Sequence, residues 1–355
     1  MAIRDRYLGC LLGGAVGDAL GAPLEFMSMD EIRLTVPITQ RESIGPPGVR
    51  SFSLAYGRLG AVTDDTQMTL FTAEGLLRAH NRLLANGIGE PPAVVHRAYL
   101  RWLETQSKNQ PPPRPDGWLA SVDDMYNRRA PGQTCLSALR TGVRGSRERP
   151  INNSKGCGGV MRVAPVGLTN NQWDPFELGC DVAAITHTHP LGYLAAGAFA
   201  LMVRELVDGK RLTRAAEVAG RAVRNVEGGQ ALRELLERAM YIAELGDPSP
   251  EHLVSLGEGW VAEEALAMGL YCAASVDNFE DGVALAVLHG GDSDSTGAIA
   301  GNLLGAMYGV GAIPEQLLRD LELYEETVRL ANDLFLHFQS PEFETTEADW
   351  LRYPG

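Results

Sequence analysis

Glycine and alanine are spread through long apolar stretches of this chain, and they strongly limit how it can fold. Residues 3–22 read IRDRYLGCLLGGAVGDALGA, and residues 289–309 read HGGDSDSTGAIAGNLLGAMYG. Neither stretch shows the strict alternation of polar and apolar residues that a half-buried strand would show. Because small side chains let helices approach one another closely, these stretches predict tightly packed helices.

Helical periodicity accounts for most of the chain, and the separators are short and contain Gly, Asp or Pro. The predicted helices span residues 3–22, 64–80, 92–105, 175–186, 190–208, 212–226, 230–245, 259–274, 279–288, 295–309 and 313–338. The sequence contains no internal repeat and no clear interdomain linker. We therefore expect an all-α fold, a compact orthogonal helical bundle that forms a single domain over residues 1–355.

Charge and cysteine content argue against several classes of function. The 355 residues carry a formal net charge of −14, which opposes nucleic-acid binding through a general positive field. The five cysteines include no CxxC pair, which argues against a disulfide framework and a thiolate zinc site. The sequence has no run of about eighteen apolar residues and no signal-peptide cleavage site, so we expect a cytoplasmic protein without membrane contact.

Two of the predicted helices begin with clustered aspartate and hydroxyl residues. One start is TDDT (residues 63–66), and the other is GGDSDSTG (residues 290–297). An acidic first turn is ordinary by itself, because carboxylates cap free amides and stabilise the positive end of the helix dipole. If folding joined the two starts, their carboxylates would repel each other unless protons or a cation neutralised them. Oxygen ligands favour magnesium, manganese or calcium over zinc, so we predict that the two starts form one metal site.

Two carboxylates near the N-terminus are further candidates. Asp18 lies inside the first Gly/Ala helix, where we interpret it as a buried polar anchor rather than a ligand. Glu25 follows the end of the same helix. It is either an ordinary surface carboxylate or a residue that binds a metal or orients a metal-bound water.

A glycine-rich turn and a histidine pair complete the candidate segments. Residues 154–165 read SKGCGGVMRVAP and match neither the P-loop nor the dinucleotide-binding pattern. This segment is either a plain tight turn or a backbone that exposes N–H groups to an anion. Its Arg162 forms a structural salt bridge or pairs with a carboxylate or phosphate. In THTHP (residues 186–190), His187 and His189 are helix-end caps or contact a ligand.

These segments, taken in order, resemble the ADP-ribosylglycohydrolase family, which includes dinitrogenase reductase-activating glycohydrolases and vertebrate ADP-ribosylarginine hydrolases. The motifs that carry the resemblance are GCLLGGAVGDALGAPLEF, TDDT, GCGGVMR, THTHP and GGDSDSTG. They span nearly the whole chain. The resemblance implies a single all-α domain with a centre of two divalent cations, Mg²⁺ or Mn²⁺.

The resemblance also implies roles for individual residues. The metal ligands would be Thr63, Asp64, Asp65, Asp292, Asp294 and Ser295. Glu25 and Asp65 are the leading candidates for the catalytic carboxylate that assists proton transfer. Cys157 and Ser295 differ from many members, which have asparagine and threonine there. The substrate-binding residues would be the diphosphate-holding loop and one histidine, that is Gly156, Cys157, Gly158, Gly159, Val160, Met161 and His187.

The implied activity is metal-dependent removal of ADP-ribose from a modified protein side chain. Arginine is the expected linkage, because GDSDSTG looks like the arginine-specific branch of the family. Two cations would hold the ribose hydroxyls, and the N-glycosidic bond would break through an oxocarbenium-like transition state. The expected partner is an ADP-ribosylated protein, and an ADP-ribosyltransferase or its target is a further candidate partner. The alternatives are hydrolysis of small ADP-ribose conjugates and a non-catalytic role in ADP-ribose binding, structure or partner masking.

Overall fold

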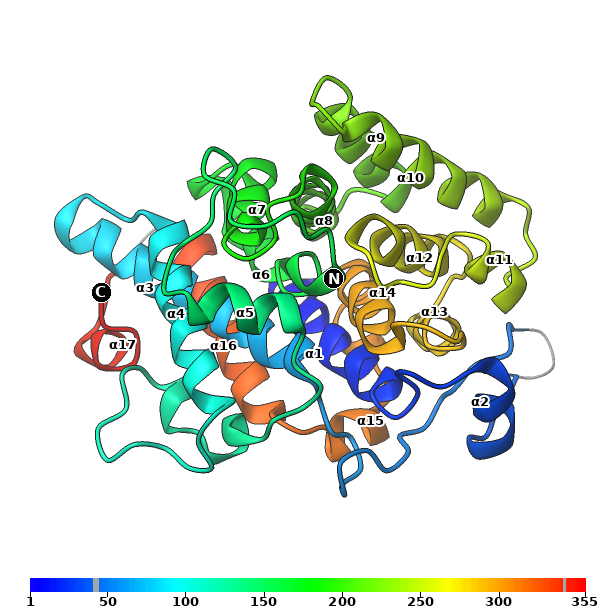
Figure 1. The fold of residues 1–355 in the computed structure, drawn as a ribbon, viewed down its shortest axis with the longest axis horizontal. Coiled ribbons are helices and arrows are strands. Elements are labelled where there is room, and N and C mark those ends of the chain that lie inside the picture. The colour runs from blue at the N-terminus through cyan, green and yellow to red at the C-terminus, as the bar shows by residue number, and fades with distance from the viewer. Residues whose placement is uncertain (41–44, 341–342) are drawn as a thin grey trace.

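The protein is built from helices. The computed structural model describes residues 1–40, 45–340 and 343–355. Within these ranges it contains helices and three isolated β-bridges but no strand, which confirms the all-α prediction (Figure 1). The α-helices are α1 (Ile3–Gly21), α2 (Met29–Thr35), α3 (Asp64–Asn86), α4 (Pro91–Thr105), α5 (Gln133–Arg140), α6 (Ala164–Gly167), α7 (Pro175–Ala184), α8 (Pro190–Val207), α9 (Leu212–Val223), α10 (Gly229–Glu244), α11 (Pro250–Val254), α12 (Ala262–Ala274), α13 (Phe279–Ala286), α14 (Ser293–Tyr308), α15 (Glu315–Asp320), α16 (Tyr324–Gln339) and α17 (Glu347–Arg352).

Helices α1 and α14 pack side by side near the middle of the molecule (Figure 1). Four positions of α1, spaced four residues apart, leave no room for a side chain. A Cβ atom at each would overlap a backbone carbonyl oxygen of α14, in the pairs Gly9 with Gly305, Gly13 with Gly301, Gly17 with Gly297 and Gly21 with Ser293. The pairing runs in opposite directions along the two helices, so they are antiparallel. The close helix packing predicted from the small residues is therefore confirmed.

The C-terminal end of α1 holds the first turns of α3 and α14. Asp18 is fully buried. Its carboxylate accepts hydrogen bonds from the backbone N–H groups of Thr63 and Thr66, both at 3.0 Å, and from both hydroxyls. The hydroxyl of Ser293 donates to the carbonyl oxygen of Gly21 at 3.1 Å. Asp18 is thus the buried anchor that the sequence predicted, and the fold brings the two acidic helix starts to one end of α1.

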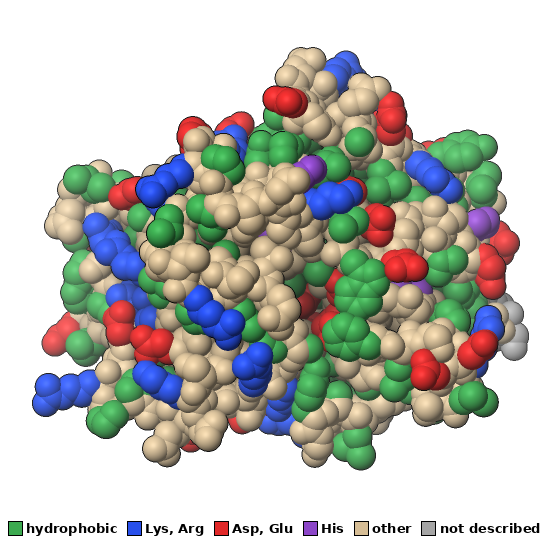
Figure 2. Space-filling model, in the orientation of Figure 1, with side chains coloured by type: hydrophobic (Ala, Val, Ile, Leu, Met, Phe, Trp, Pro, Cys, Tyr) green, Lys and Arg blue, Asp and Glu red, His purple; other side chains and the backbone are tan. Residues whose placement is uncertain are grey.

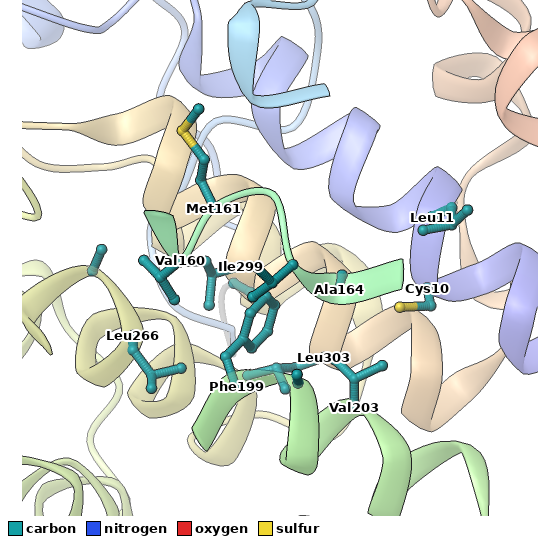
Figure 3. Close-up of a cluster of buried hydrophobic side chains, with 14 of the residues drawn as sticks. Cys10, Leu11, Val160, Met161, Ala164, Phe199, Val203, Leu266, Ile299 and Leu303 are labelled. Carbon is teal, nitrogen blue, oxygen red and sulfur yellow. The ribbon is translucent and has the colours of Figure 1, made fainter. Parts of the chain in front are cut away.

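Apolar side chains from five helices and one loop form a continuous core (Figure 3). The side chains in this view come from α1, α6, α8, α12, α14 and the end of the glycine-rich turn, namely Cys10, Leu11, Ala164, Phe199, Val203, Leu266, Ile299, Leu303, Val160 and Met161. Val160 and Met161 are 0% and 2% exposed. Burial of these two side chains fixes the glycine-rich turn against the core.

One predicted helix is interrupted. The sequence predicts a continuous helix over 313–338, whereas the chain forms α15 and α16 with a break between them. Leu323 lies in the break with a φ of 58°, a conformation that no α-helix contains. The break lets Glu322 turn inward, where its carboxylate accepts from the backbone N–H of Val62 at 3.0 Å and pairs with Arg129 at 3.2 Å. The chain therefore makes these two tertiary interactions in place of a continuous helix, although the local sequence pattern is helical.

Helix α8 is apolar enough to raise the question of a membrane span. It has 18 residues with a mean hydropathy of 1.3, and by length and composition it could cross a bilayer. However, 72% of it is buried inside the protein, where it packs against α7 and α9. A core helix meets the same criteria as a membrane span, because both are rich in apolar side chains.

Candidate active site

Both acidic helix starts line one cavity of about 560 Å³, which is large enough for a nucleotide-sized ligand. The first turn of α5 and the glycine-rich turn line the same cavity. Figure 2 shows acidic atoms in a hollow near the middle of the visible face, beside a group of hydrophobic side chains. The residues that the sequence singled out and that line this cavity are Glu25, Asp64, Asp65, Gly156, Cys157, Gly158, Met161, His187, Asp292, Asp294 and Ser295.

Three of the predicted site residues lie outside the lining. Thr63 is fully buried, and its hydroxyl donates to Asp18 at 2.9 Å. Val160 points into the core, as Figure 3 shows. Gly159 is buried against His187. The sequence motif therefore includes residues that support the cavity wall as well as residues that form it.

Five carboxyl groups in the cavity or behind its wall favour their protonated forms. Burial, together with the charge of Asp294, raises the pKa of Asp18 to about 7. Burial and the charges of Asp294 and Asp292 raise the pKa of Glu25 to about 10. Burial is also the first cause that holds the pKa of Asp65 well above its usual range. Burial likewise raises the pKa values of Asp64 and Asp292. In the absence of a neutralising ligand, these groups disfavour one another's charges.

Two oxygen atoms at the acidic cluster have no partner among the described residues. They are Oδ1 of Asp65 and Oε2 of Glu25, both of which are shielded from solvent. An unpartnered carboxylate oxygen is costly to bury, and a hard cation would satisfy it. The described part of the chain contains no group of three His, Cys, Asp or Glu side chains already arranged to hold a metal ion. Cation binding would therefore require these carboxylates to turn toward one another.

The glycine-rich turn is tied to the loop before α12. The backbone N–H of Cys157 donates to the carbonyl oxygen of Trp260 at 3.1 Å, and the backbone N–H of Ala262 donates to Lys155 at 2.8 Å. The Cys157 thiol donates to Oδ2 of Asp292 at 2.6 Å. These contacts place the glycine-rich turn beside the start of α14. The turn and this acidic helix start therefore contact each other directly through Cys157 and Asp292.

His187 lines the cavity, and one of its ring nitrogens contacts a neighbouring hydroxyl. Burial is the main cause that lowers its pKa to about 3, so the imidazole is neutral. The guanidinium of Arg162 donates to the hydroxyl of Thr186 at 2.7 Å, and this hydroxyl lies 2.8 Å from Nδ1 of His187. Because the Thr186 hydroxyl accepts from Arg162, it can donate its own hydrogen bond to Nδ1. The proton of the neutral ring then lies on Nε2, which can act as a donor. His189 instead caps α8, with Nδ1 accepting from the backbone N–H of Leu191.

Arg162 differs from both sequence-based alternatives. It is fully buried and makes no ion pair with the described residues. Besides Thr186, it donates to the sulfur of Cys135 at 3.3 Å, and its guanidinium lies 4.3 Å from the ring centroid of Tyr99. The arginine thus stabilises the wall of the cavity through a hydroxyl, a sulfur and an aromatic face.

Sequence reasoning missed several residues of the cavity. Phe26 and Trp260 stack at its mouth with ring centroids 5.4 Å apart, and Arg128 and residues 130–135 line it. These residues lie in loops or at the beginning of a short helix, where no periodic pattern marks them. The only sequence signal is the position of Phe26 next to Glu25.

Comparison with known proteins agrees with the geometry. A family model described as ADP-ribosylglycohydrolase matches residues 1–343. The chain is 30% identical to ADP-ribosyl-[dinitrogen reductase] glycohydrolase of Rhodospirillum rubrum, over 94% of this chain and 97% of that protein. It is 25% identical to ADP-ribosylarginine hydrolase Tri1 of Pseudomonas putida, over 93% of this chain and 78% of that protein.

Vertebrate and structural relatives extend the comparison. Mouse ADP-ribosylhydrolase ARH3 is 28% identical, over 94% of this chain and 92% of that protein. A solved structure titled ADP-ribosylglycohydrolase-related protein complex shares 31% identity and a TM-score of 0.65, over 94% of this chain and 98% of that chain. The chain therefore belongs to the ADP-ribosylglycohydrolase family of hydrolases.

Proposed function

We propose that this protein hydrolyses the bond between ADP-ribose and a protein side chain, with ADP-ribosyl-arginine as its preferred linkage. One observation carries the proposal: the acidic helix starts and the glycine-rich turn line the same cavity. Such a cavity suits a ligand that has ribose hydroxyls at one end and a diphosphate at the other. The names of two relatives support a protein substrate, one for ADP-ribosylated dinitrogen reductase and one for ADP-ribosylarginine.

We also propose that the acidic cluster binds two divalent cations, Mg²⁺ or Mn²⁺. The oxygen-rich donor set and the raised carboxyl pKa values support this proposal. The residues that would hold the cations are Asp64, Asp65, Asp292, Asp294 and Ser295. When bound, the cations would hold the ribose hydroxyls and would make a ribose hydroxyl or an attacking water easier to deprotonate.

The residues of the chain itself account for binding and proton transfer. Glu25 is the leading candidate for the group that protonates the departing side-chain nitrogen, because its surroundings favour the protonated form. Asp65 remains the alternative, because one of its oxygens has no partner. The Nε2–H of His187 and the backbone of the glycine-rich turn would hold the rest of the ligand.

The proposed chemistry also suggests a partner and a cellular compartment for the protein. An ADP-ribosylated substrate requires an ADP-ribosyltransferase, so the transferase or its target is the expected partner. We propose that the protein acts in the cytoplasm. There its five free cysteines, four of them buried, would stay reduced.

Comparison of linkages tests the proposed function. Peptides that carry ADP-ribose on arginine, serine or aspartate, together with small ADP-ribose conjugates, would be incubated with the full chain and Mn²⁺. We expect free ADP-ribose, measured by chromatography, to appear fastest from the arginine peptide. Release from the small conjugates alone would instead assign a small-molecule hydrolase. Binding without release from any substrate would contradict catalysis and support an ADP-ribose-binding role.

The raised carboxyl pKa values predict how stability depends on pH. Asp18 and Glu25 hold protons more tightly in the folded chain, where their pKa values are about 7 and about 10, than in the unfolded chain, where they are about 4. The metal-free protein should therefore lose stability as pH rises from about 4 through these folded values. Because Mn²⁺ competes with the protons, it should raise the melting temperature more at pH 8 than at pH 5.

Thermal unfolding followed by circular dichroism checks this prediction at both pH values, with and without Mn²⁺. Potassium chloride at matched ionic strength is the control for general screening. A shift by Mn²⁺ that is equal at both pH values, or larger at pH 5, would contradict the assignment.

A further inference from the structure

The cavity lining contains many more acidic than basic side chains. Its lining includes five carboxylates, namely Glu25, Asp64, Asp65, Asp292 and Asp294. Arg128 is the only lysine or arginine in the described lining. Because His187 is neutral, Arg128 is also the only fixed positive charge there. Among the side chains of this lining, an anionic ligand could therefore find a cationic partner only at Arg128.

The segment around Arg128 is anchored on both sides. On one side, the side-chain amide of Gln67 donates to the carbonyl oxygen of Asn127 at 2.8 Å. On the other side, the carbonyl oxygen of Arg129 accepts from the backbone N–H of Asp64 at 3.3 Å. Both anchors belong to the first turns of α3, which carries part of the acidic cluster. These hydrogen bonds hold the backbone on both sides of Arg128 beside that cluster.

Arg128 and its neighbour Arg129 differ in their partners: the guanidinium of Arg129 is bound within the protein, whereas that of Arg128 has no such partner among the described residues. Arg129 is 5% exposed, pairs with Glu322 at 3.2 Å and lies 4.9 Å from the ring centroid of Tyr56. Arg128 is exposed and makes no ion pair or side-chain hydrogen bond with the described residues. Its five N–H donors therefore remain available for a ligand.

A guanidinium in this position matches the chemistry of a diphosphate. Its planar set of donors binds phosphate oxygens in pairs, and such charged hydrogen bonds are stronger than neutral ones. The residues of the glycine-rich turn that line the same cavity, Gly156, Cys157, Gly158 and Met161, bring no positive side chain to it. A phosphate group near this turn would therefore need its positive partner from another segment, and Arg128 lines the same cavity.

We propose that Arg128 binds the diphosphate of the ADP-ribosyl group and positions the substrate so that its ribose lies at the acidic cluster. This inference rests on the proposed function for the identity of the ligand. Arg128 contributes binding and orientation, whereas proton transfer belongs to the carboxylates. Its loss should therefore weaken the binding of ligands that carry the diphosphate and should leave the chemical step largely intact.

Binding measurements on the full chain test this inference. Isothermal titration with ADP-ribose, ADP and adenosine would be performed on the wild type, Arg128→Ala, Arg128→Lys and Arg97→Ala. Arg97 is exposed on α4, lies outside the cavity lining and makes no ion pair with the described residues, so its replacement controls for net charge. In Arg128→Ala, the dissociation constants of ADP-ribose and ADP should rise by about tenfold to a hundredfold, which is the usual effect of losing a charged hydrogen bond.

Adenosine binding should be the same in all four proteins, and Arg128→Lys should recover part of the lost affinity. With a hydrolysable substrate, KM should rise in Arg128→Ala while kcat stays within about threefold. Equal affinity of Arg128→Ala and Arg97→Ala for ADP-ribose would overturn the inference. An equal loss of adenosine and ADP affinity would also overturn it, because it would indicate a structural role.

The same experiment separates this inference from the proposed function. Wild-type protein that binds ADP-ribose through Arg128 but releases it from no conjugate would support the inference and contradict the hydrolase activity. Wild-type protein that hydrolyses a conjugate while Arg128→Ala keeps full ADP affinity would do the reverse. Wild-type protein that does not bind ADP-ribose or ADP would overturn the inference.

Discussion

Replacement of Asp292 by asparagine should slow ADP-ribose release about a thousandfold while leaving the fold intact. Asp292 caps α14, with its carboxylate accepting from the backbone N–H of Ser295 at 3.3 Å. Asparagine caps a helix about as well as aspartate, so Asp292→Asn removes the charge and keeps the cap. Loss of a proposed metal ligand should cost about 4 kcal/mol of transition-state stabilisation, or about a thousandfold in rate.

The melting temperature of metal-free Asp292→Asn should equal or exceed that of the wild type, because a source of carboxylate repulsion is gone. Asp292→Ala should lose the same activity and a further ~1 kcal/mol of stability with the cap. Asp174→Asn is the matched control, because Asp174 caps α7 away from the cavity. Full activity of Asp292→Asn, measured as ADP-ribose release, would contradict the assignment of the acidic cluster.

Gly301→Ala should strongly destabilise the protein, although alanine is normally the better residue in a helix. The new Cβ would overlap the carbonyl oxygen of Gly13 and would lie 3.1 Å from the backbone nitrogen of Gly14. Because both neighbours are backbone, no side-chain rotation can relieve the overlap. The helices would have to separate, and we expect a loss of at least ~3 kcal/mol in the free energy of unfolding.

The sign of this change is diagnostic. A glycine-to-alanine change without steric conflict usually stabilises a helix by about 0.5 to 1 kcal/mol. Gly311→Ala is the control, because a Cβ at Gly311 has nothing within 4 Å and the backbone there is not left-handed. Urea unfolding followed by circular dichroism compares the two variants. A Gly301→Ala variant as stable as Gly311→Ala would contradict the close packing of α1 and α14.

The parts of the fold that depend on local sequence patterns could be predicted from the sequence. The periodic helices, the small residues of α1 and α14 and the burial of Asp18 are all visible as local patterns. The partner of α1 could not be predicted, because glycine stretches reveal close packing but not which helix packs there. The break before α16 also escaped prediction, since it depends on Glu322 reaching Val62 and Arg129 far away in the sequence.

Some residues of the candidate site could likewise be predicted from local sequence, whereas others could not. The acidic helix starts were predicted from their composition, and the fold places both on one cavity. Arg128 and Trp260 escaped prediction because each lies in a loop whose position depends on contacts with distant segments. Thr63 and Val160 belong to the motifs, yet their side chains are buried behind the cavity wall. The sequence motifs therefore located the site, but they did not show which of their residues line the cavity and which support its wall.

Reconstitution with metal tests the central claim most directly. The protein would be stripped with a chelator, its metal content measured, and the rate of ADP-ribose release from an ADP-ribosyl-arginine peptide followed as Mn²⁺ or Mg²⁺ is added. We predict no release from the stripped protein and full activity when about two cations are bound per chain. Undiminished release from protein that contains no divalent cation would contradict the account.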